Sequence, residues 1–410
     1  MKNIVILGGS YAGVSSVHYL LKHVVPQLPD PSSYQVVLIT PSTEVVSRPA
    51  TVRGLISDDL LRQDQLWNNI KSTLETLYSK DTFRFVHGKA TALDTEARAV
   101  TVQLAGDSNN TERIEYHSLI IATGASTLSP LFSLKEDGEA LKKTWAEFRK
   151  ALPGAKHIVL TGGGATAVET AAELGEHLNG RPGWFGSKAD PKVKITLITS
   201  ASKILPGLRD SIAETAEGYL TQLGVTVVKN VKVTGVSPEG SGATVLTTKT
   251  EVALSDGRTL DADIYIPAAG LTPNTSFVPQ NLLAEDGRIK VDPSTARVEG
   301  AGPRVYAFGD ASNLHRPFIY FLKLAAPVLG HNIKRDLLIA AGKDAASLEA
   351  DKEWKTDTRE AQLVTLGRNK AVGVVMGTKL PGWLVWWFKG RDAGVSMAGS
   401  FWGGKDFEKA

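Results

Sequence analysis

Short apolar runs separated by amphipathic stretches recur along most of this chain. The runs at 4–7, 119–121, 158–160 and 195–198 are almost entirely apolar, which is typical of parallel strands buried on both faces. Behind the first run, residues 13–23 place apolar side chains at helical spacing. This alternation of strand and helix predicts an α/β fold built on parallel sheets.

The period at which apolar residues recur changes in several later regions. Between about 82 and 116, apolar and polar residues alternate, which predicts an antiparallel β-meander inserted into the first unit. Apolar stripes predict an amphipathic helix over 58–80 and a connecting helix over 138–151. Further expected elements are a helix over 209–223, a helix over 318–339 that is kinked at or begins at Pro327, a charged linker over 344–360, strands at 362–367 and 371–375, and polar turns at 106–110 and 180–186.

A glycine turn follows two of the buried strands. The strand at 158–160 leads into Gly162-Gly163-Gly164, and the strand at 4–7 leads into Gly8 to Gly13. Strand, tight turn and helix in this order can bind a dinucleotide, because glycine lets backbone approach a pyrophosphate and the helix N-terminus offers N–H groups to it. One such turn also occurs in units that bind nothing. Two copies favour two dinucleotides facing each other, as in a flavin enzyme reduced by a nicotinamide.

The ends of the second strands depart from the dinucleotide fingerprint, in which an Asp or Glu binds the ribose hydroxyls. The first unit has Thr40 there, with Glu44 further on, and Ser10 replaces the second glycine of its turn. The second unit has Thr199, followed by Lys203. Hydroxyls and a lysine can bind a 2′-phosphate, so this strand end slightly favours NADPH over NADH. A solvated surface lysine is the alternative explanation of Lys203.

Two other strand ends carry small or acidic residues. Ala122-Thr123-Gly124 lies between the two glycine turns, where two-dinucleotide flavoproteins use an Ala-Thr-Gly turn. Asp310, after Gly309, can accept hydrogen bonds from a sugar-alcohol chain, and an ordinary helix N-cap is the alternative. The predicted fold is α/β, with two Rossmann-like dinucleotide-binding domains and a small C-terminal α+β domain. The expected domains are 1–150 with 271–342, then 151–270, and then 343–410.

Composition narrows the chemistry. The chain has 410 residues, a net charge of +3 and no cysteine. The missing cysteines exclude disulfides, thiolate metal sites and a dithiol redox centre, and the small charge gives no case for nucleic-acid binding. The histidines show no metal-ligand spacing, so no metal site is expected. With no apolar run near the length of a membrane-spanning helix and no room for a signal peptide before the first strand, we expect a cytoplasmic protein.

A tryptophan-rich segment at 381–391 has two interpretations. Its aromatic rings, with Lys389 and Arg391 for lipid phosphates, are typical of an interfacial anchor that gives peripheral membrane contact. The alternative is a core helix or a homodimer contact of the C-terminal domain.

Several motifs together carry a family resemblance: Gly8 to Gly13, Ala122 to Gly124, Gly162 to Glu169, Pro273-Asn274, Gly309-Asp310 and the tail at 364–391. With them the chain resembles the flavoproteins related to apoptosis-inducing factor, in the branch of the mitochondrion-associated inducer of death and the ferroptosis suppressor. More distantly it resembles type II NADH dehydrogenases. The resemblance implies FAD in the first nucleotide domain and NADPH or NADH in the second.

The resemblance also implies roles for single residues. Asp310 would hold the ribityl chain, Lys323 would lie near the flavin, and Glu169 would point toward the nicotinamide–flavin contact. Glu169 and Lys323 are therefore the expected catalytic residues. The expected cofactor-binding residues are Gly8, Gly9, Ser10, Ala12, Gly13, Thr40, Arg48, Ala122, Thr123, Gly124, Gly162, Gly164, Ala165, Thr166, Thr199, Lys203, Gly270, Gly309 and Asp310.

These observations favour an NAD(P)H-dependent flavin oxidoreductase. Hydride would pass from the nicotinamide to the flavin, and electrons would then pass to an acceptor, for which a quinone is the first choice. The cofactor carries the chemistry, so no acid–base dyad is required. The alternatives are a tailoring oxidoreductase acting on a specialised small metabolite and a non-enzymatic redox-sensing flavoprotein.

Overall fold

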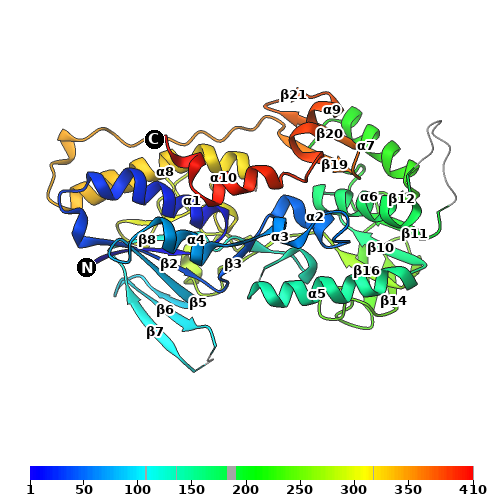
Figure 1. Cartoon of the computed structure of the whole chain (residues 1–410), viewed down its shortest axis with the longest axis horizontal. Coiled ribbons are helices and arrows are strands. Elements are labelled where there is room, and N and C mark those ends of the chain that lie inside the picture. Colours follow the sequence, from blue (N-terminus) through cyan, green and yellow to red (C-terminus); the bar gives the residue numbers. More distant parts are fainter. Residues whose placement is uncertain (107–108, 135, 182–190, 317, 410) are drawn as a thin grey trace.

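The protein has two lobes, each built around a parallel sheet, and a C-terminal segment that contacts both (Figure 1). The computed structural model describes residues 1–106, 109–134, 136–181, 191–316 and 318–409. The polar turns expected at 106–110 and 180–186 therefore lie partly outside the described residues.

The first lobe holds a mixed sheet. Its parallel strands are β1 (Lys2–Leu7), β2 (Tyr34–Thr40), β5 (Phe83–Asp94), β8 (Ser118–Ile121) and β18 (Val305–Ala307), and its antiparallel strands are β6 (Ala99–Leu104) and β7 (Thr111–Glu115). Among the described residues the order is β18-β8-β1-β2-β5-β6-β7. The expected meander thus continues the nucleotide sheet through β5, which is one long strand rather than two short ones.

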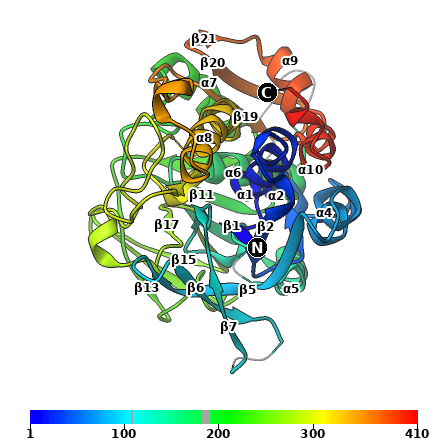
Figure 2. The same ribbon diagram turned by 90° about the vertical axis from the view of Figure 1, so that its left-hand side faces the viewer.

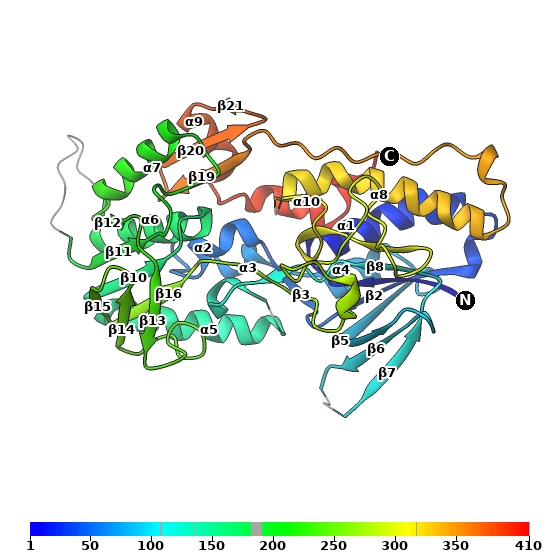
Figure 3. The ribbon, with the colours of Figure 1, turned by 180° about the vertical axis from the view of Figure 1, so that it is seen from behind.

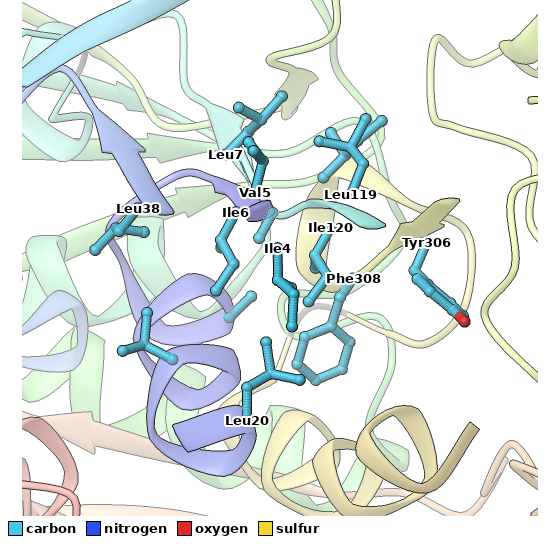
Figure 4. Close-up of a cluster of buried hydrophobic side chains, with 14 of the residues drawn as sticks. Ile4, Val5, Ile6, Leu7, Leu20, Leu38, Leu119, Ile120, Tyr306 and Phe308 are labelled. Atoms are coloured by element: carbon cyan, nitrogen blue, oxygen red, sulfur yellow. The ribbon is translucent and has the colours of Figure 1, made fainter. Parts of the chain in front are cut away.

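The core of this lobe explains why its strands read as unbroken apolar runs. Ile4, Val5 and Ile6 are fully buried on β1, and Phe308 and Leu20 pack into the same cluster (Figure 4). Helices α1 (Tyr11–Tyr19) and α8 (Ile319–Ala340) lie side by side over this sheet (Figure 2). They approach closely because Gly330 leaves room for the Tyr19 ring; a Cβ at Gly330 would lie 2.1 Å from it.

The second lobe repeats the plan. Its parallel sheet has the order β12-β11-β10-β16, from β10 (His157–Thr161), β11 (Lys194–Ile198), β12 (Val225–Val228) and β16 (Ile264–Pro267). It carries helices α5 (Gly138–Ala151), α6 (Ala165–Asn179) and α7 (Asp210–Gln222), and a small sheet of β13 (Val233–Ser237), β14 (Thr250–Leu254) and β15 (Thr259–Ala262). The prediction of two Rossmann-like units is confirmed by these two parallel sheets.

Short elements complete both lobes. They are β3 (Glu44–Val46), α2 (Thr51–Gly54), α3 (Gln63–Leu66), β4 (Trp67–Asn69), α4 (Ile70–Leu77), β9 (Ala125–Ser126) and β17 (Thr272–Pro273). The single helix expected over 58–80 is therefore wrong. Residues 67–69 pair with β3 as a strand, and Asn69 then caps α4 by accepting a hydrogen bond from the Ser72 N–H at 2.9 Å. Pro327 lies inside α8 rather than at its start.

The C-terminal segment 349–408, which we call the clasp, runs from one lobe to the other and back (Figure 3). Residues 349–359 lie along α8 of the first lobe, where Asn332 exchanges two hydrogen bonds with the Lys352 backbone and Trp354 is buried. The charged linker expected over 344–360 includes this stretch, which has no helix or strand, and its backbone is also hydrogen-bonded to α8. Next come β19 (Gln362–Leu366), β20 (Lys370–Val375), β21 (Thr378–Lys379) and α9 (Gly382–Val385) on the second lobe, and α10 (Ala398–Trp402) on the first.

Candidate functional site

The first glycine turn is held by close backbone packing between β1 and β8. Gly8 has φ +108°, and a Cβ there would lie 2.3 Å from the Ala122 carbonyl oxygen. A Cβ on Gly13 would lie 1.7 Å from the Gly8 oxygen. Helix α1 then begins at Tyr11, and the Ser10 side chain makes no capping bond to it. The first N–H groups of this helix are thus left for another acceptor, which fits a pyrophosphate.

A second group of predicted residues meets this turn from other strands. A Cβ on Gly309 would lie 2.8 Å from the Cβ of Ala12, so the Gly309-Asp310 turn abuts the first turn of α1. Burial lowers the pKa of Arg48, and the nearby Asp310 and Tyr11 oppose that shift. Arg48 also donates to the Phe132 carbonyl at 3.1 Å. Arg48 and Asp310 therefore lie close enough for their charges to interact, although they are far apart in sequence.

Thr40, the residue expected at the adenosine ribose, lies beside the first glycine turn. Its buried hydroxyl lies against Gly9, since a Cβ on Gly9 would meet the Thr40 Oγ1 at 2.7 Å. Glu44, the other expected candidate, is bonded through Oε2 to the Lys142 ammonium at 2.7 Å. The carboxylate of Glu44 is thus already committed to α5.

The crossover between the lobes joins two of the predicted motifs. Asn274 donates its backbone N–H to the Gly124 carbonyl at 2.9 Å and its side-chain amide to the Thr123 carbonyl at 3.0 Å. Thr123 Oγ1 donates back to the Asn274 carbonyl at 2.8 Å. The two strands that cross between the lobes, β9 and β17, pair antiparallel beside these bonds. The Ala-Thr-Gly and Pro-Asn motifs are thus one hydrogen-bonded unit, and Gly270 at φ +77° precedes it.

The second glycine turn repeats the geometry of the first. Gly162 has φ +135°, and a Cβ there would lie 2.7 Å from the Ala268 oxygen. Helix α6 begins at Ala165, directly before Thr166, with Gly164 as an N-cap that has no side chain to cap it. No heavy atom of the described residues lies within 4 Å of the position a Gly164 Cβ would take, beyond its chain neighbours. This open space before a free helix N-terminus fits a second pyrophosphate.

The end of β11 borders this second turn. A Cβ on Gly163 would lie 2.5 Å from Thr199 Oγ1. Lys203 follows on the same loop, and its ammonium donates to the Leu208 carbonyl and to Asp210 Oδ1, each at 2.6 Å. Lys203 is therefore an ion-paired residue, not a free solvated lysine.

Glu169 is directed at the clasp. Its buried Oε1 accepts hydrogen bonds from the Thr365 N–H at 2.7 Å, the Thr365 hydroxyl at 3.0 Å and the Lys389 ammonium at 2.7 Å. One turn further along α6, Glu173 accepts two bonds from Arg53 of α2 at 2.8 and 3.0 Å. Glu169, Glu173 and the nearby Glu176 form a carboxylate stripe at helical spacing, which is a signal the sequence contains and the sequence analysis missed.

Lys323 also contacts the clasp. Its ammonium is ion-paired with Asp406 and lies 5.6 Å from the centre of the Phe401 ring. Phe401 and Trp402 in turn pack on Tyr11, with ring centres 5.0 and 4.6 Å apart. Burial raises the pKa of Tyr11 to about 12. The clasp thus brings two aromatic rings to Tyr11 at the start of α1 and pairs Asp406 with Lys323 of α8, a grouping the sequence did not reveal.

Comparison with known proteins places this geometry in a family. A model of the pyridine nucleotide-disulphide oxidoreductases matches residues 2–325. The chain belongs to this family. Oxidoreductase phnG of Penicillium herquei is 52% identical over 410 residues, which is 100% of this chain and 97% of that protein. Ferroptosis suppressor protein 1 of Xenopus tropicalis is 25% identical over 406 residues, covering 96% of this chain and 94% of that protein.

A solved structure supports the fold of this chain. NDH2 of Plasmodium falciparum, in complex with NADH, superposes with a TM-score of 0.65 at 17% identity, covering 100% of this chain and 99% of that chain. The resemblance to apoptosis-inducing-factor-like flavoproteins is confirmed by these relatives, and FAD with NAD(P)H as cofactors is confirmed at the level of the family. This member has no cysteine, so it lacks the dithiol from which the family takes part of its description.

Proposed function

We propose that this oxidoreductase takes hydride from NADH or NADPH and delivers the electrons to a quinone. The observation that carries the proposal is the pair of glycine turns, each at the end of a buried strand and before a helix whose start has no side-chain cap. FAD, when bound, supplies the hydride-accepting chemistry. The first turn would hold its pyrophosphate, with Asp310 on the ribityl chain and Thr40 at the adenosine ribose.

The chain's own residues would position the reactants and exclude water. Asp310 and Arg48 would fix the first cofactor from opposite sides, and the interlobe bonds of Thr123 and Asn274 would fix the angle between the two nucleotides. Glu169 would hold its carboxylate in a fixed position, because Lys389 and Thr365 both donate to it. The expected catalytic roles of Glu169 and Lys323 stay proposals.

A quinone is the acceptor that the clasp favours. Phe401 and Trp402 are buried against Tyr11, which makes an apolar, aromatic wall at the start of α1. Tyr11 is the partly exposed ring of this group and would be the one to contact a planar, weakly polar acceptor. The absence of cysteine leaves no dithiol to receive the electrons instead. The alternative is reduction or oxidation of a specialised small metabolite, which the 52% identity to Oxidoreductase phnG of Penicillium herquei keeps open.

We further propose peripheral membrane contact through the segment 381–391, with a homodimer contact as the alternative. Trp383, Trp387 and Phe388 are 70%, 53% and 42% exposed. Arg391 lies over the Trp387 ring at 6.0 Å and is placed for a lipid phosphate. Lys389 is not, since it is bonded to Glu169. None of the helices in the described parts of the chain is long and apolar enough to cross a membrane.

The proposal is tested by anaerobic titration of the FAD-loaded protein with NADH and with NADPH, followed by flavin absorbance. Stoichiometric bleaching by either nucleotide supports the two-nucleotide site. A soluble short-chain quinone added anaerobically should then restore the absorbance in stoichiometric amounts. Flavin that neither nucleotide bleaches would refute the hydride step, and bleached flavin that no quinone reoxidises would refute the acceptor.

A further inference from the structure

The loop after β11 lies where the adenosine ribose of a nucleotide on the second glycine turn would sit. Besides the contact of Thr199 with Gly163, the Leu205 N–H donates to the Gly163 carbonyl at 2.6 Å. In dinucleotide sites of this kind, residues at this strand end contact the ribose 2′ position and separate NADH from NADPH. A carboxylate at the strand end itself usually binds the ribose hydroxyls of NADH, and here that position is occupied by Thr199.

The carboxylate comes instead from the next helix. Asp210 is the first residue of α7, and its Oδ1 lies 2.6 Å from the Lys203 ammonium. The Lys203 side chain is 27% exposed and the Asp210 side chain 80%, so the pair forms at the surface, where a nucleotide could reach it. The carbonyl of Leu208 holds the same ammonium in place at 2.6 Å.

Two other cations near this edge are also paired. Arg209 donates to Glu360 at 2.7 Å, and Glu360 is close enough to Lys203 to interact with its charge. Lys229, at the end of β12, is paired with Glu217 at 3.0 Å. Lys203, Arg209 and Lys229 thus each have a carboxylate partner. A 2′-phosphate, which carries close to two negative charges, would have to compete with these carboxylates for the three cations.

We propose that Asp210 is a specificity-determining residue that makes the second site prefer the 2′-hydroxyl of NADH to the 2′-phosphate of NADPH. The inference rests on the proposed function, in which the second turn holds NAD(P)H. Asp210 occupies the ammonium that a 2′-phosphate would need and repels the phosphate, whereas a neutral 2′-hydroxyl meets no such conflict. The preference for NADPH that Lys203 alone predicts is therefore reversed by its partner, Asp210.

Binding of nucleotide fragments tests this without catalysis. The FAD-loaded full-length protein is titrated in a calorimeter with ADP and with 2′,5′-ADP, so that the first site is already filled. We expect the wild type to bind 2′,5′-ADP no more tightly than ADP. Asp210→Asn should raise the affinity for 2′,5′-ADP by about fivefold to tenfold, and leave ADP within about twofold, because it frees Lys203 for a charge-assisted bond at a partly exposed site.

Three further variants show whether the gain passes through Lys203 and is specific to Asp210. Adding Lys203→Met to Asp210→Asn should abolish the gain. Glu214→Gln, which removes one exposed carboxylate from the same helix, is the matched control and should change neither affinity. Asp210→Ser serves as a second substitution that also suits a helix start, and melting curves confirm that each variant is folded.

Three results would overturn the inference: a wild type that already prefers 2′,5′-ADP, an Asp210→Asn variant that shifts both ligands equally or neither, or the same gain from Glu214→Gln. If neither fragment binds the wild type, the nucleotide site itself is absent and the proposed function falls with the inference. That outcome is distinct from equal binding of both fragments, which removes only the role of Asp210.

Discussion

Arg53 is the residue at which both lobes and the clasp meet, and its replacement by methionine is the sharpest test of the packing described here. It lies in α2 of the first lobe, bonds Glu173 of the second lobe, and donates to the Gly390 carbonyl at 2.9 Å and the Gly367 carbonyl at 3.4 Å in the clasp. The side chains of Arg53 and Glu173 are 3% and 1% exposed. Arg53→Met therefore leaves a carboxylate buried without its counter-ion.

The expected cost follows from that burial. Removing one partner of a buried ion pair destabilises a protein by about 3–5 kcal/mol, because the remaining charge is neither solvated nor paired. Replacing both partners by apolar residues removes that penalty. The double variant Arg53→Met with Glu173→Leu should therefore be less destabilised than Arg53→Met alone. Its remaining destabilisation should be about 2 kcal/mol, because the two backbone carbonyls still lose their donor. Arg84→Met, which breaks a partly exposed pair with Glu112, is the control and should cost less than about 1 kcal/mol.

The pH dependence gives an independent check. Burial raises the pKa of Glu173, the charge of Arg53 opposes this shift, and Arg53→Met should raise that pKa further. A carboxyl whose folded pKa exceeds its unfolded value binds a proton more readily in the folded state. Stability is therefore lost as pH rises through the folded pKa and regained below it. The penalty of Arg53→Met should accordingly be larger at about pH 8 than at about pH 5.

Urea unfolding followed by circular dichroism measures all four proteins at both pH values. The reasoning is refuted if Arg53→Met is as stable as the Arg84→Met control, or if adding Glu173→Leu recovers nothing. A penalty that is the same at both pH values would show that Glu173 is not the group left unpaired.

Other changes have equally definite outcomes. Gly13→Ala forces a methyl against the Gly8 oxygen, so the purified protein should lose most of its bound flavin, measured by its absorbance ratio, whereas Gly154→Ala, in open space, should keep it. Asp310→Leu should weaken flavin retention at least tenfold through lost hydrogen bonds to the ribityl chain, and full retention would remove that role. Trp383→Ala with Trp387→Ala should abolish flotation with anionic liposomes; flotation that persists, or is absent in the parent, would remove the anchor.

The sequence predicted those parts of the fold that local pattern determines. The two glycine turns, their strands and their helices were all located from the residues themselves. This was possible because an apolar run followed by glycine and small residues leaves few alternative backbones. The paired strands β19 and β20 were found for a similar reason, since two short, mainly apolar runs are separated by a turn that contains Gly367.

The sequence could not show partnerships between distant segments. Glu169 was predicted to point toward the nicotinamide, yet in the folded chain its carboxylate is bonded to Thr365 and Lys389, which lie about 200 residues later. A helical stripe over 58–80 hid the strand at 67–69, because that strand exists only through its pairing with β3. The charged stretch before β19 looked like a linker because the acceptors and donors that hold it lie on α8.

The path of the clasp also determines the order in which the two lobes can be completed during translation. The first lobe needs β18 and α8, which leave the ribosome after the whole second lobe has been made, and the clasp follows them. A nascent chain can therefore complete its second lobe while the first is still an open sheet that lacks an edge strand and a covering helix. The last residues close over the first nucleotide turn only at the end. Phe407 is then buried, and the carbonyls of Trp402 and Gly404 are bonded to side chains of the helical segment that starts with α1. Flavin loading before that closure meets no barrier from the clasp, so a chain cut short before α10 would keep its nucleotide turns but leave the first of them uncovered.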